Sequence, residues 1–578
     1  MKDVFNRSNN RYILQTIDEV FRRSLNLIAI VGSIFAIFVL LMQVRQTNTE
    51  NFYISNYDKI INIITIFFIL VLLDQIRIAP RKLYIIVPIV QIIGLLLLNF
   101  FSKKYYNIYT SRIIWTITGS ILFFLIIVIN WLRLSYSKLT LYQMIIASFI
   151  FVITLGSLLL YLPLSTVSGR LSFIDALYTA TSAVCVTGLS VIDVSKELNF
   201  FGQIILIVLI QIGGLGIMSI SAIVLLFSIN KGSVQDRVRT LEMFNTQNKD
   251  IIQSTIKVIF LSTFLIELIG AISIFTVMDN NNFLDRIFYS IFHSISAFCN
   301  AGFSLYSDNL HKYSTNITMN ITIVFLIIFG GIGYSVILTI FRSILNKIKG
   351  KRYIFDVQAR IVIYTSIALI LLGFLFIFFN EYSNALKDLS LKEKILISIF
   401  QSVSPRTAGF ETISYNSMSN VTNGLIIFLM FVGASPNSTG GGVKTTTLFV
   451  FMFSVITAIF NRPYIIVNNR KIKSSAINKS VAIVTLSITI IVISALTIFY
   501  IENSLPMMTI IFEVVSAIST AGLSFGVTNS FTIWSKIIFI FLMFIGRVGY
   551  LTVFMSIGSI NQSKYTIIDL PTSDVTIG

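Results

Sequence analysis

The chain has 578 residues, of which 55% are hydrophobic and 12% are charged. Soluble domains are about 45–50% apolar and about 25% charged, so this composition, with a mean hydropathy of +0.86, excludes a soluble enzyme and predicts a polytopic membrane protein. The net charge of +18 is interpreted as loop charge that orients membrane spans, and no nucleic-acid partner is expected. With two cysteines and two histidines, the chain is expected to have no disulfide framework, no metal cluster and no enzymatic activity.

The first part of the chain, residues 1–138, is expected to be a membrane module of about four helices. Apolar runs near 25–44, 60–79, 83–101 and 112–132 have about the 20 residues that span a bilayer. Basic residues precede the first run and no small-residue cleavage site follows it, which predicts an anchor with a cytoplasmic N-terminus. A voltage sensor would carry basic residues at every third position of one span, and none of these runs does, so an accessory bundle is favoured.

From about residue 139 a different unit recurs. It consists of a long apolar segment, a short apolar segment, a Gly-centred tetrapeptide and a second long apolar segment, and it occupies residues 139–235, 236–350, 351–470 and 471–578. The central glycines follow one another at intervals of 114, 107 and 113 residues: Gly188, Gly302, Gly409 and Gly522. Second landmark glycines follow after 24 to 28 residues: Gly213, Gly330, Gly433 and Gly546. Two landmarks in constant phase predict four tandem repeats.

The short segments lie near 173–185, 284–299, 394–405 and 508–519. A helix of this length rises only about 18–22 Å, too little for a hydrocarbon core of about 30 Å. They are therefore predicted to be re-entrant half-helices that end inside the membrane at the tetrapeptides. Non-helical backbone at that depth is tolerated where protein covers it or where it lines an aqueous pathway, so the four elements predict one shared pathway.

Loop charge predicts the orientation of the chain. Fifteen basic residues lie in the connections at 231–249, 342–360 and 462–479. Four leading spans would place these connections on the cytoplasmic side with the N-terminus, and the tetrapeptides would then face outward. Basic residues between 103 and 112 disagree with this scheme, so the exact number of N-terminal spans stays open.

The tetrapeptides have the composition that a cation filter needs. Backbone carbonyls can replace the water of a desolvated alkali cation, and pointing successive carbonyls at one axis requires dihedral angles that glycine adopts at low cost. Each preceding half-helix adds its negative C-terminal end. The alternative, close packing between helices, explains a single glycine but not four in phase. The predicted K⁺ site consists of the backbone carbonyls of Val186, Thr187, Gly188, Asn300, Ala301, Gly302, Thr407, Ala408, Gly409, Thr520, Ala521 and Gly522.

The same stretches resemble the Trk/Ktr/HKT superfamily of potassium transporters. The resemblance is carried by Thr179-Ala180-Thr181-Ser182-Ala183-Val184-Cys185-Val186-Thr187-Gly188-Leu189, Phe298-Cys299-Asn300-Ala301-Gly302-Phe303, Pro405-Arg406-Thr407-Ala408-Gly409-Phe410 and Ser519-Thr520-Ala521-Gly522-Leu523-Ser524. The first looks most like the KtrB branch. The resemblance covers about 139–560 and implies an all-α membrane fold of four helix–pore-loop–helix repeats around a single pore. In this family glycine at all four filter positions goes with potassium, and serine at the first goes with sodium.

The third repeat departs from the others, because a polar segment at 433–447 divides its second long apolar segment. Polar backbone at this depth should face the pathway, and the segment resembles the family's intramembrane gating loop. A kinked helix or an interfacial loop is the alternative. Arg547 lies mid-membrane in the last long segment and should find acceptors there, since a buried guanidinium is costly. The predicted gate consists of Gly433, Ser435, Pro436, Asn437, Gly440, Gly441, Gly442, Lys444 and Arg547.

These features predict potassium uptake across the cell membrane through a gated, channel-like pore in a multi-pass protein surrounded by lipid. The resemblance implies a homodimer controlled by a cytosolic ring of nucleotide-binding subunits. The chain itself is expected to hold no cofactor; K⁺ is the transported ion and Na⁺ a candidate activator. Two alternatives stay open: a Na⁺-coupled or sodium-permeable secondary cation transporter, which usually has two inverted halves, and the membrane subunit of an ion-pumping complex. Na⁺ dependence, the regulatory nucleotide and partner, the function of the N-terminal module and the role of Glu267 also stay open, while His293 and His311 are interpreted as structural.

Overall fold

The computed structural model describes residues 141–168, 171–228, 249–278, 282–348, 350 and 355–558. All of them belong to one compact unit, residues 139–578. The spans predicted within residues 1–138 and the basic residues at 231–248 lie outside the described residues.

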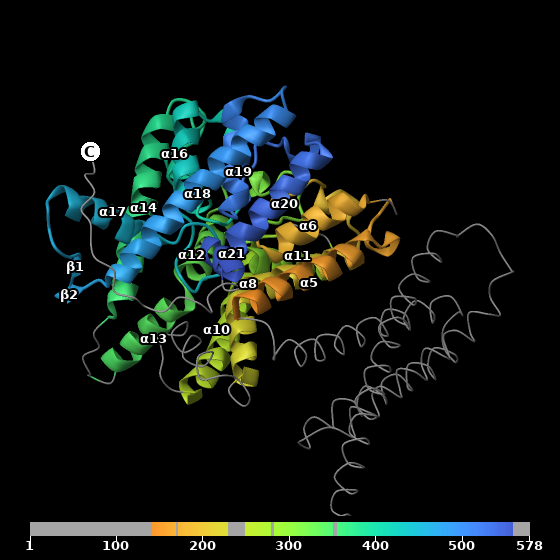
Figure 1. Ribbon diagram of the computed structural model, residues 1–578. Coiled ribbons are helices and arrows are strands. Elements are labelled where there is room, and N and C mark those ends of the chain that lie inside the picture. Colours follow the sequence, from red (N-terminus) through yellow and green to blue (C-terminus); the bar gives the residue numbers. More distant parts are fainter. Residues whose placement is uncertain are drawn as a thin grey trace, which may run out of the picture. The chain divides into compact units, whose positions relative to one another are not determined.

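The described chain is almost entirely helical (Figure 1). Four groups of a long, a short and a second long helix follow one another. The first is α5 (Leu141–Tyr161), α6 (Phe173–Val184) and α8 (Phe200–Ser228). The second is α10 (Lys249–Val277), α11 (Phe283–Phe298) and α12 (Ile317–Ile332), continued by α13 (Tyr334–Ile348). The third is α14 (Val357–Glu381), α15 (Leu391–Val403) and α16 (Asn420–Phe431), continued by α17 (Thr445–Ile459). The fourth is α18 (Ser474–Ile501), α19 (Met507–Ile518) and α20 (Ile533–Val548), continued by α21 (Tyr550–Gly558).

The predicted short segments are helices, and each begins within three residues of its expected start. Local capping sets these starts. The side chains of Ser172, Asn282 and Ser390 accept hydrogen bonds from backbone N–H groups in the first turns of α6, α11 and α15, which satisfies donors that a helix start leaves open. Pro506 precedes α19, where its missing N–H costs nothing.

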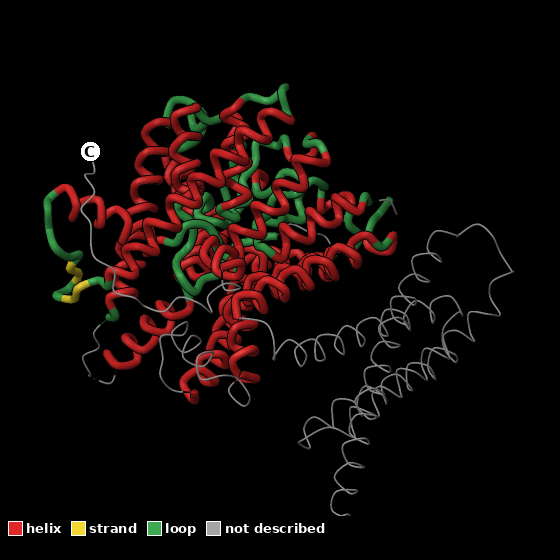
Figure 2. Tube along the Cα trace, in the orientation of Figure 1, coloured by secondary structure: helices red, strands yellow, loops and turns green. Residues whose placement is uncertain are grey.

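The groups pack in a closed cycle. In the first, second and fourth groups the short helix packs against both of its long helices. The second long helix of each group also packs against the next short helix: α8 on α11, α12 on α15, α16 on α19 and finally α20 on α6. This arrangement places the non-helical segments in the middle of the bundle, where Figure 2 shows loops in green among red helices.

The long helices present apolar faces to the outside. Phe264, Ile269 and Phe379 are 64%, 62% and 71% exposed, which is suited to contact with lipid. In the part of the chain that the structure describes, three helices are long and apolar enough to cross a membrane, at Ile259–Val277, Val357–Glu381 and Ser474–Ile501. Together with these outward apolar faces they make the chain a multi-pass membrane protein.

The second long segments of the second and fourth groups are divided, as well as that of the third. Gly333 separates α12 from α13 with φ +94° and a bend of 103°. Gly549 separates α20 from α21 with φ +96°. Both glycines lie three residues after a landmark glycine, and their positive φ values end the helical hydrogen bonding in a conformation that side chains disfavour.

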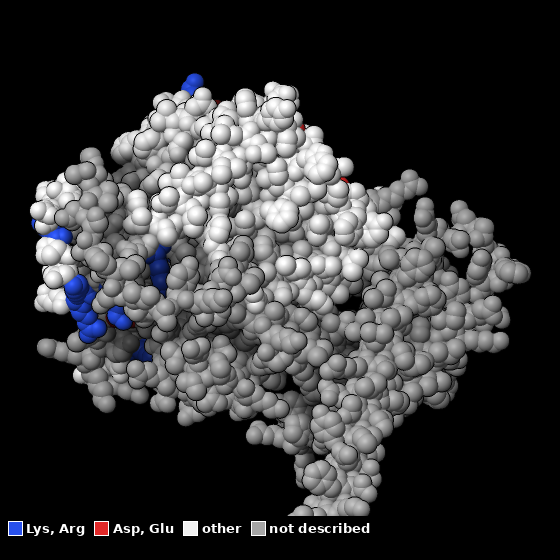
Figure 3. Space-filling model, in the orientation of Figure 1, with Lys and Arg blue, Asp and Glu red and all other residues white. Residues whose placement is uncertain are grey.

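A short hairpin, β1 (Ile466–Val467) and β2 (Arg470–Lys471), is the one β-sheet in the described residues. Its turn residues Asn468 and Asn469 both have positive φ, as a two-residue turn of this kind requires. On the face drawn in Figure 3 most of the visible basic side chains gather at this end, and the described helices beside it show few charged groups. The exposed basic residues here are Arg462, Arg470, Lys471, Lys473 and Lys479.

Candidate ion pathway

Each short helix leads into a tetrapeptide through a left-handed residue. At the end of α6 the N–H of Thr187 donates to the Ser182 carbonyl at 2.8 Å, and the N–H of Val186 donates to the Ala183 carbonyl at 3.1 Å. This is the pairing of a Schellman motif, and it recurs after α11 and α19. The left-handed positions hold Val186, Asn300, Thr407 and Thr520, with φ of 56°, 59°, 75° and 51°. Sequence reasoning missed this conformation because these are not glycines.

The four central glycines lie together in a closed ring, which we call the glycine ring. Each has positive φ, between 68° and 92°. A Cβ placed on Gly188 would lie 2.5 Å from the Ala301 oxygen, and one on Gly522 would lie 2.1 Å from the Thr187 oxygen. Neighbouring contacts join the ring in the order Gly188, Gly302, Gly409, Gly522 and back to Gly188. No side chain fits this spacing without displacing backbone.

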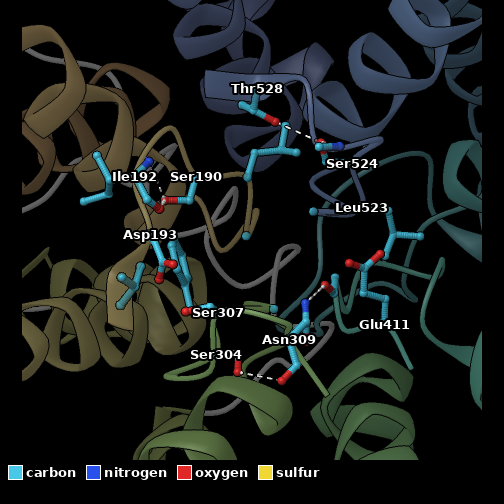
Figure 4. A pocket seen from close by; sticks show the side chains of 18 of the residues that line it. Ser190, Ile192, Asp193, Ser304, Ser307, Asn309, Glu411, Leu523, Ser524 and Thr528 are labelled. Atoms are coloured by element: carbon cyan, nitrogen blue, oxygen red, sulfur yellow. Dashed lines mark hydrogen bonds between the residues drawn. The ribbon is translucent and has the colours of Figure 1, made fainter. Parts of the chain in front are cut away.

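A cavity of about 300 Å³ adjoins the ring, and all four glycines lie in its wall. Its other lining groups are mostly hydroxyls, amides and backbone, with the carboxylates of Asp193 and Glu411 (Figure 4). None of the described residues that line it is Lys or Arg. Partial burial acts to raise the pKa of Asp193, but hydrogen bonds from Ser195, Ser307 and Lys196 outweigh it and lower that pKa. The cavity therefore has a negative character that suits cations.

The 433–447 segment lies against the opposite side of the ring. The N–H of Gly441 donates to Thr520 Oγ1 at 3.0 Å, and a Cβ on Gly440 would lie 2.1 Å from Thr407 Oγ1. Each of these threonines lies two residues before the ring glycine of its group. The predicted non-helical segment is three residues too long at its C-terminal end. α17 begins at Thr445, so the last three residues of 433–447 are helical.

Other bonds fix the segment to the second group. Ser435 N–H donates to the Gly331 carbonyl at 2.9 Å, and Thr439 N–H donates to the Gly330 carbonyl at 3.2 Å. In return, Tyr334 N–H donates to the Asn437 carbonyl at 2.9 Å. The α12–α13 break at Gly333 supplies these groups, because a continuous helix would have used them internally.

Arg547 is buried on α20 and donates to the carbonyls of Thr439 and Gly213, with a longer bond of 3.4 Å to Gly214. It therefore links the 433–447 segment to α8. Lys444 does not extend freely toward the ring: its Nζ donates to the Gly440 carbonyl at 2.6 Å and to the Gly441 carbonyl at 3.4 Å. The ammonium group thus folds back on its own segment.

The second landmark glycines are sites of close helix packing. A Cβ on Gly330 or Gly546 would lie 1.9 Å from the carbonyl oxygen of Phe298 or Ile518, and one on Gly213 would lie 2.2 Å from that of Val184. These oxygens belong to the last residues of α11, α19 and α6. Gly433 differs, because its nearest neighbour is the Gly441 oxygen of the 433–447 segment.

Glu267, for which the sequence offered no partner, accepts hydrogen bonds from Gln211 Nε2 at 3.1 and 3.3 Å. Cys299 Sγ lies 3.6 Å from Gln211 Oε1. The carboxyl is thus part of the contact between the first two groups. Among the described residues no group of three or more His, Cys, Asp or Glu side chains could hold a metal ion.

Comparison with known proteins decides the family. The profile of TrkH, described as a cation transport protein, matches residues 116–565. The chain belongs to the TrkH family of cation transport proteins. Ktr system potassium uptake protein B of Bacillus subtilis (strain 168) is 36% identical over 441 residues, which cover 76% of this chain and 96% of that protein. The protein of the same name from Vibrio alginolyticus is 32% identical over 439 residues, 75% and 94% of the two chains.

The fold agrees with this assignment. The potassium transporter TrkH from Vibrio parahaemolyticus superimposes with a TM-score of 0.60 at 17% identity, covering 86% of this chain and 97% of that one. The predicted resemblance to the Trk/Ktr superfamily, and to its KtrB branch, is confirmed.

Proposed function

We propose that this TrkH-family protein takes up K⁺ through a pore whose selectivity filter is the glycine ring. One observation carries the proposal: four glycines with positive φ meet in a closed ring, each after a short helix that ends beside it. Carbonyls held in this way can replace the hydration shell of K⁺. The names of the Bacillus subtilis and Vibrio alginolyticus relatives, both potassium uptake proteins, support the choice of ion.

We expect the four groups to act as repeats around one pore, with the cavity as its outer entrance. The carboxylates of Asp193 and Glu411 would then concentrate cations outside the filter. The basic connections and the hairpin would lie on the cytoplasmic side.

The test is ⁸⁶Rb⁺ uptake by liposomes that hold the full chain alone. Gly188→Ser should admit Na⁺, because its Cβ meets the Ala301 oxygen and a hydroxyl enters the ring. External Na⁺ should then compete better with Rb⁺ than in the wild type. Unchanged competition in a protein that still transports would contradict the filter assignment, and absence of flux would favour a subunit of a larger complex.

A sodium-permeable transporter is the second candidate. A relative from Enterococcus hirae, 34% identical over 424 residues, is named a potassium/sodium uptake protein. Direct ²²Na⁺ uptake without K⁺ would favour this candidate, while strict exclusion of Na⁺ would favour the first.

We further propose that the 433–447 segment is the gate and that Arg547 holds it closed. Thr439 supports this assignment, since its carbonyl bonds Arg547 while its N–H and hydroxyl bond the second group. The segment would obstruct ions directly beneath the filter, and movement away from Thr407 and Thr520 would open the path.

Regulation would come from outside the chain. We propose a homodimer that binds a cytosolic ring of nucleotide-binding subunits, with Na⁺ as a candidate activator. Residues 1–138 would be an accessory module, so their deletion should leave a selective pore. A truncated protein that folds but loses K⁺ selectivity would contradict that assignment.

A further inference from the structure

Two buried side chains, His293 and Glu513, occupy the same place in different groups. Each lies nine residues before its ring glycine, on α11 and α19, and each is 0% exposed. Sequence reasoning interpreted His293 only as structural and did not single out Glu513.

Glu513 holds the chain that follows Gly522. Its Oε1 accepts from Ser524 Oγ at 2.6 Å and from the Phe525 N–H at 2.9 Å. Ser524 Oγ in turn accepts from the Gly526 N–H at 2.8 Å. The carboxyl group therefore fixes the two residues that turn the chain away from the ring.

His293 makes the corresponding contacts after Gly302. Its Nδ1 lies 2.8 Å from the Tyr289 carbonyl. Because a carbonyl only accepts, Nδ1 carries the proton and Nε2 is an acceptor. Nε2 accepts from the Leu305 N–H at 3.4 Å and lies 3.1 Å from Ser304 Oγ. Ser304 Oγ accepts from the Tyr306 N–H at 3.0 Å, as Ser524 does from Gly526.

The other two groups lack this brace. The position nine residues before Gly188 is Thr179, whose hydroxyl has no hydrogen-bond partner among the described residues, and the position before Gly409 is Phe400. In the third group Gln401, one residue later, reaches further out, to the Ile413 carbonyl at 3.1 Å and the Tyr415 hydroxyl. The braced groups are the second and fourth, which lie opposite one another in the ring order.

We propose that His293 and Glu513 are positioning residues that fix the backbone beyond Gly302 and Gly522 and thereby set the discrimination of K⁺ from Na⁺. The inference rests on the proposed filter. Selectivity by carbonyls requires that they keep their spacing under the pull of a smaller ion, and such a site must be held by its surroundings to within about 0.5 Å. A brace on two opposite sides restrains the width of the ring along one diagonal.

The test measures the external Na⁺ concentration that halves ⁸⁶Rb⁺ uptake by liposomes holding the full chain. Glu513→Ala and His293→Ala remove the acceptors and should lower that concentration about fivefold, since hydrogen bonds at buried groups are expensive to lose. Glu513→Gln and His293→Gln present a side-chain oxygen that can accept these hydrogen bonds. These two variants should therefore retain most of the discrimination that the alanine variants lose. Glu381→Ala is the matched control, because Glu381 is also 0% exposed but clamps the Ser419–Thr422 turn; it should leave the competition unchanged.

A second set of variants changes the hydroxyls that bond His293 and Glu513, in case the alanine variants of those two residues do not fold. Ser304→Ala and Ser524→Ala delete one small hydroxyl each at the edge of the cavity and should shift the competition about twofold in the same direction. Ser190→Ala is their control, since among the described residues Ser190 Oγ bonds only Ile192, through the N–H and carbonyl of that residue.

The outcomes separate this inference from the filter assignment. If Gly188→Ser weakens discrimination while the Glu513, His293, Ser304 and Ser524 variants transport with wild-type competition, the brace is refuted and the filter stands. If Gly188→Ser also has no effect, both are refuted. A shift in Ser524→Ala and Ser304→Ala but not in Ser190→Ala supports the brace.

Discussion

Replacing Arg547 by Met should open the gate, and the structure sets the size of the effect. The guanidinium donates to one carbonyl of the 433–447 segment, that of Thr439, and its other acceptors, Gly213 and Gly214, lie on α8. A hydrogen bond from a charged group contributes about 1.5–3 kcal/mol net, and about 1.4 kcal/mol is a factor of ten in an equilibrium constant. Loss of this tie should therefore favour displacement of the segment about ten- to a hundredfold.

The measurement is basal ⁸⁶Rb⁺ flux through liposomes with the full chain and no partner protein. Arg547→Met should raise it until the open state is saturated, without changing competition by Na⁺, because the ring is not touched. Arg286→Met is the matched control: Arg286 also donates to a carbonyl, that of Phe275 at 2.6 and 2.8 Å, but does not contact the segment. Basal flux of Arg547→Met equal to wild type, in protein of normal size-exclusion profile, would refute the gate.

Three further predictions follow from single contacts. Gly546→Ala places a Cβ 1.9 Å from the Ile518 oxygen and should destabilise the protein by about 1–3 kcal/mol or more. The measurement is the melting temperature in detergent, which should fall. Gly424→Ala is the control and should not lower it, because a Cβ on Gly424 has no neighbouring atom within 4 Å. The Glu411 carboxylate, whose Oε1 lies 3.5 Å from His311 Nε2, accepts from the protonated imidazole and raises the pKa of His311. The ion pair is therefore fully formed below the ordinary pKa of His and is lost as pH rises through the raised pKa. Rb⁺ affinity should increase over that rise, because the Glu411 carboxylate loses its counter-charge, and an unchanged pH profile in His311→Gln would contradict this. Neutralising the exposed basic residues between 462 and 479 should weaken co-purification of a cytosolic partner at low salt, whereas binding that survives would locate the contact elsewhere.

Much of the framework could be predicted because it depends on local lengths and spacings. A segment of 12 to 16 residues between longer apolar segments is too short to cross the hydrocarbon core as a helix, so a re-entrant helix is expected. Each of the four is a helix that ends beside a ring glycine. The constant phase of the second landmark also had a physical cause. Gly330 and Gly546 approach the last carbonyl of a short helix so closely that no other residue fits.

What could not be predicted depends on conformations and pairs that residue type does not reveal. Val186 and Thr520 adopt the left-handed region, although β-branched residues disfavour it, since the Schellman bonds and the ring contacts determine their backbone. The partnership of Glu267 with Gln211 joins residues from different groups. Glu513 gave no signal, because a glutamate nine residues before a glycine has meaning only once the turn after that glycine is known.

The third group shows why the polar segment occurs where it does. In the other groups the short helix ends four residues before the ring glycine and packs against its second long helix, through a glycine that meets the helix-end carbonyl. α15 ends at Val403, six residues before Gly409. Pro405 follows, and it cannot donate the hydrogen bond that would continue the helix. α16 makes the same contacts as its counterparts with α14 and α19 but lacks their close packing on the preceding short helix, and Gly433 faces Gly441. The space beside the third ring residue is therefore filled by the 433–447 segment rather than by a helix. All four groups contribute a glycine of similar conformation to the closed ring. On the side opposite the cavity, however, the third group contributes the backbone of the 433–447 segment, which a few hydrogen bonds hold in place.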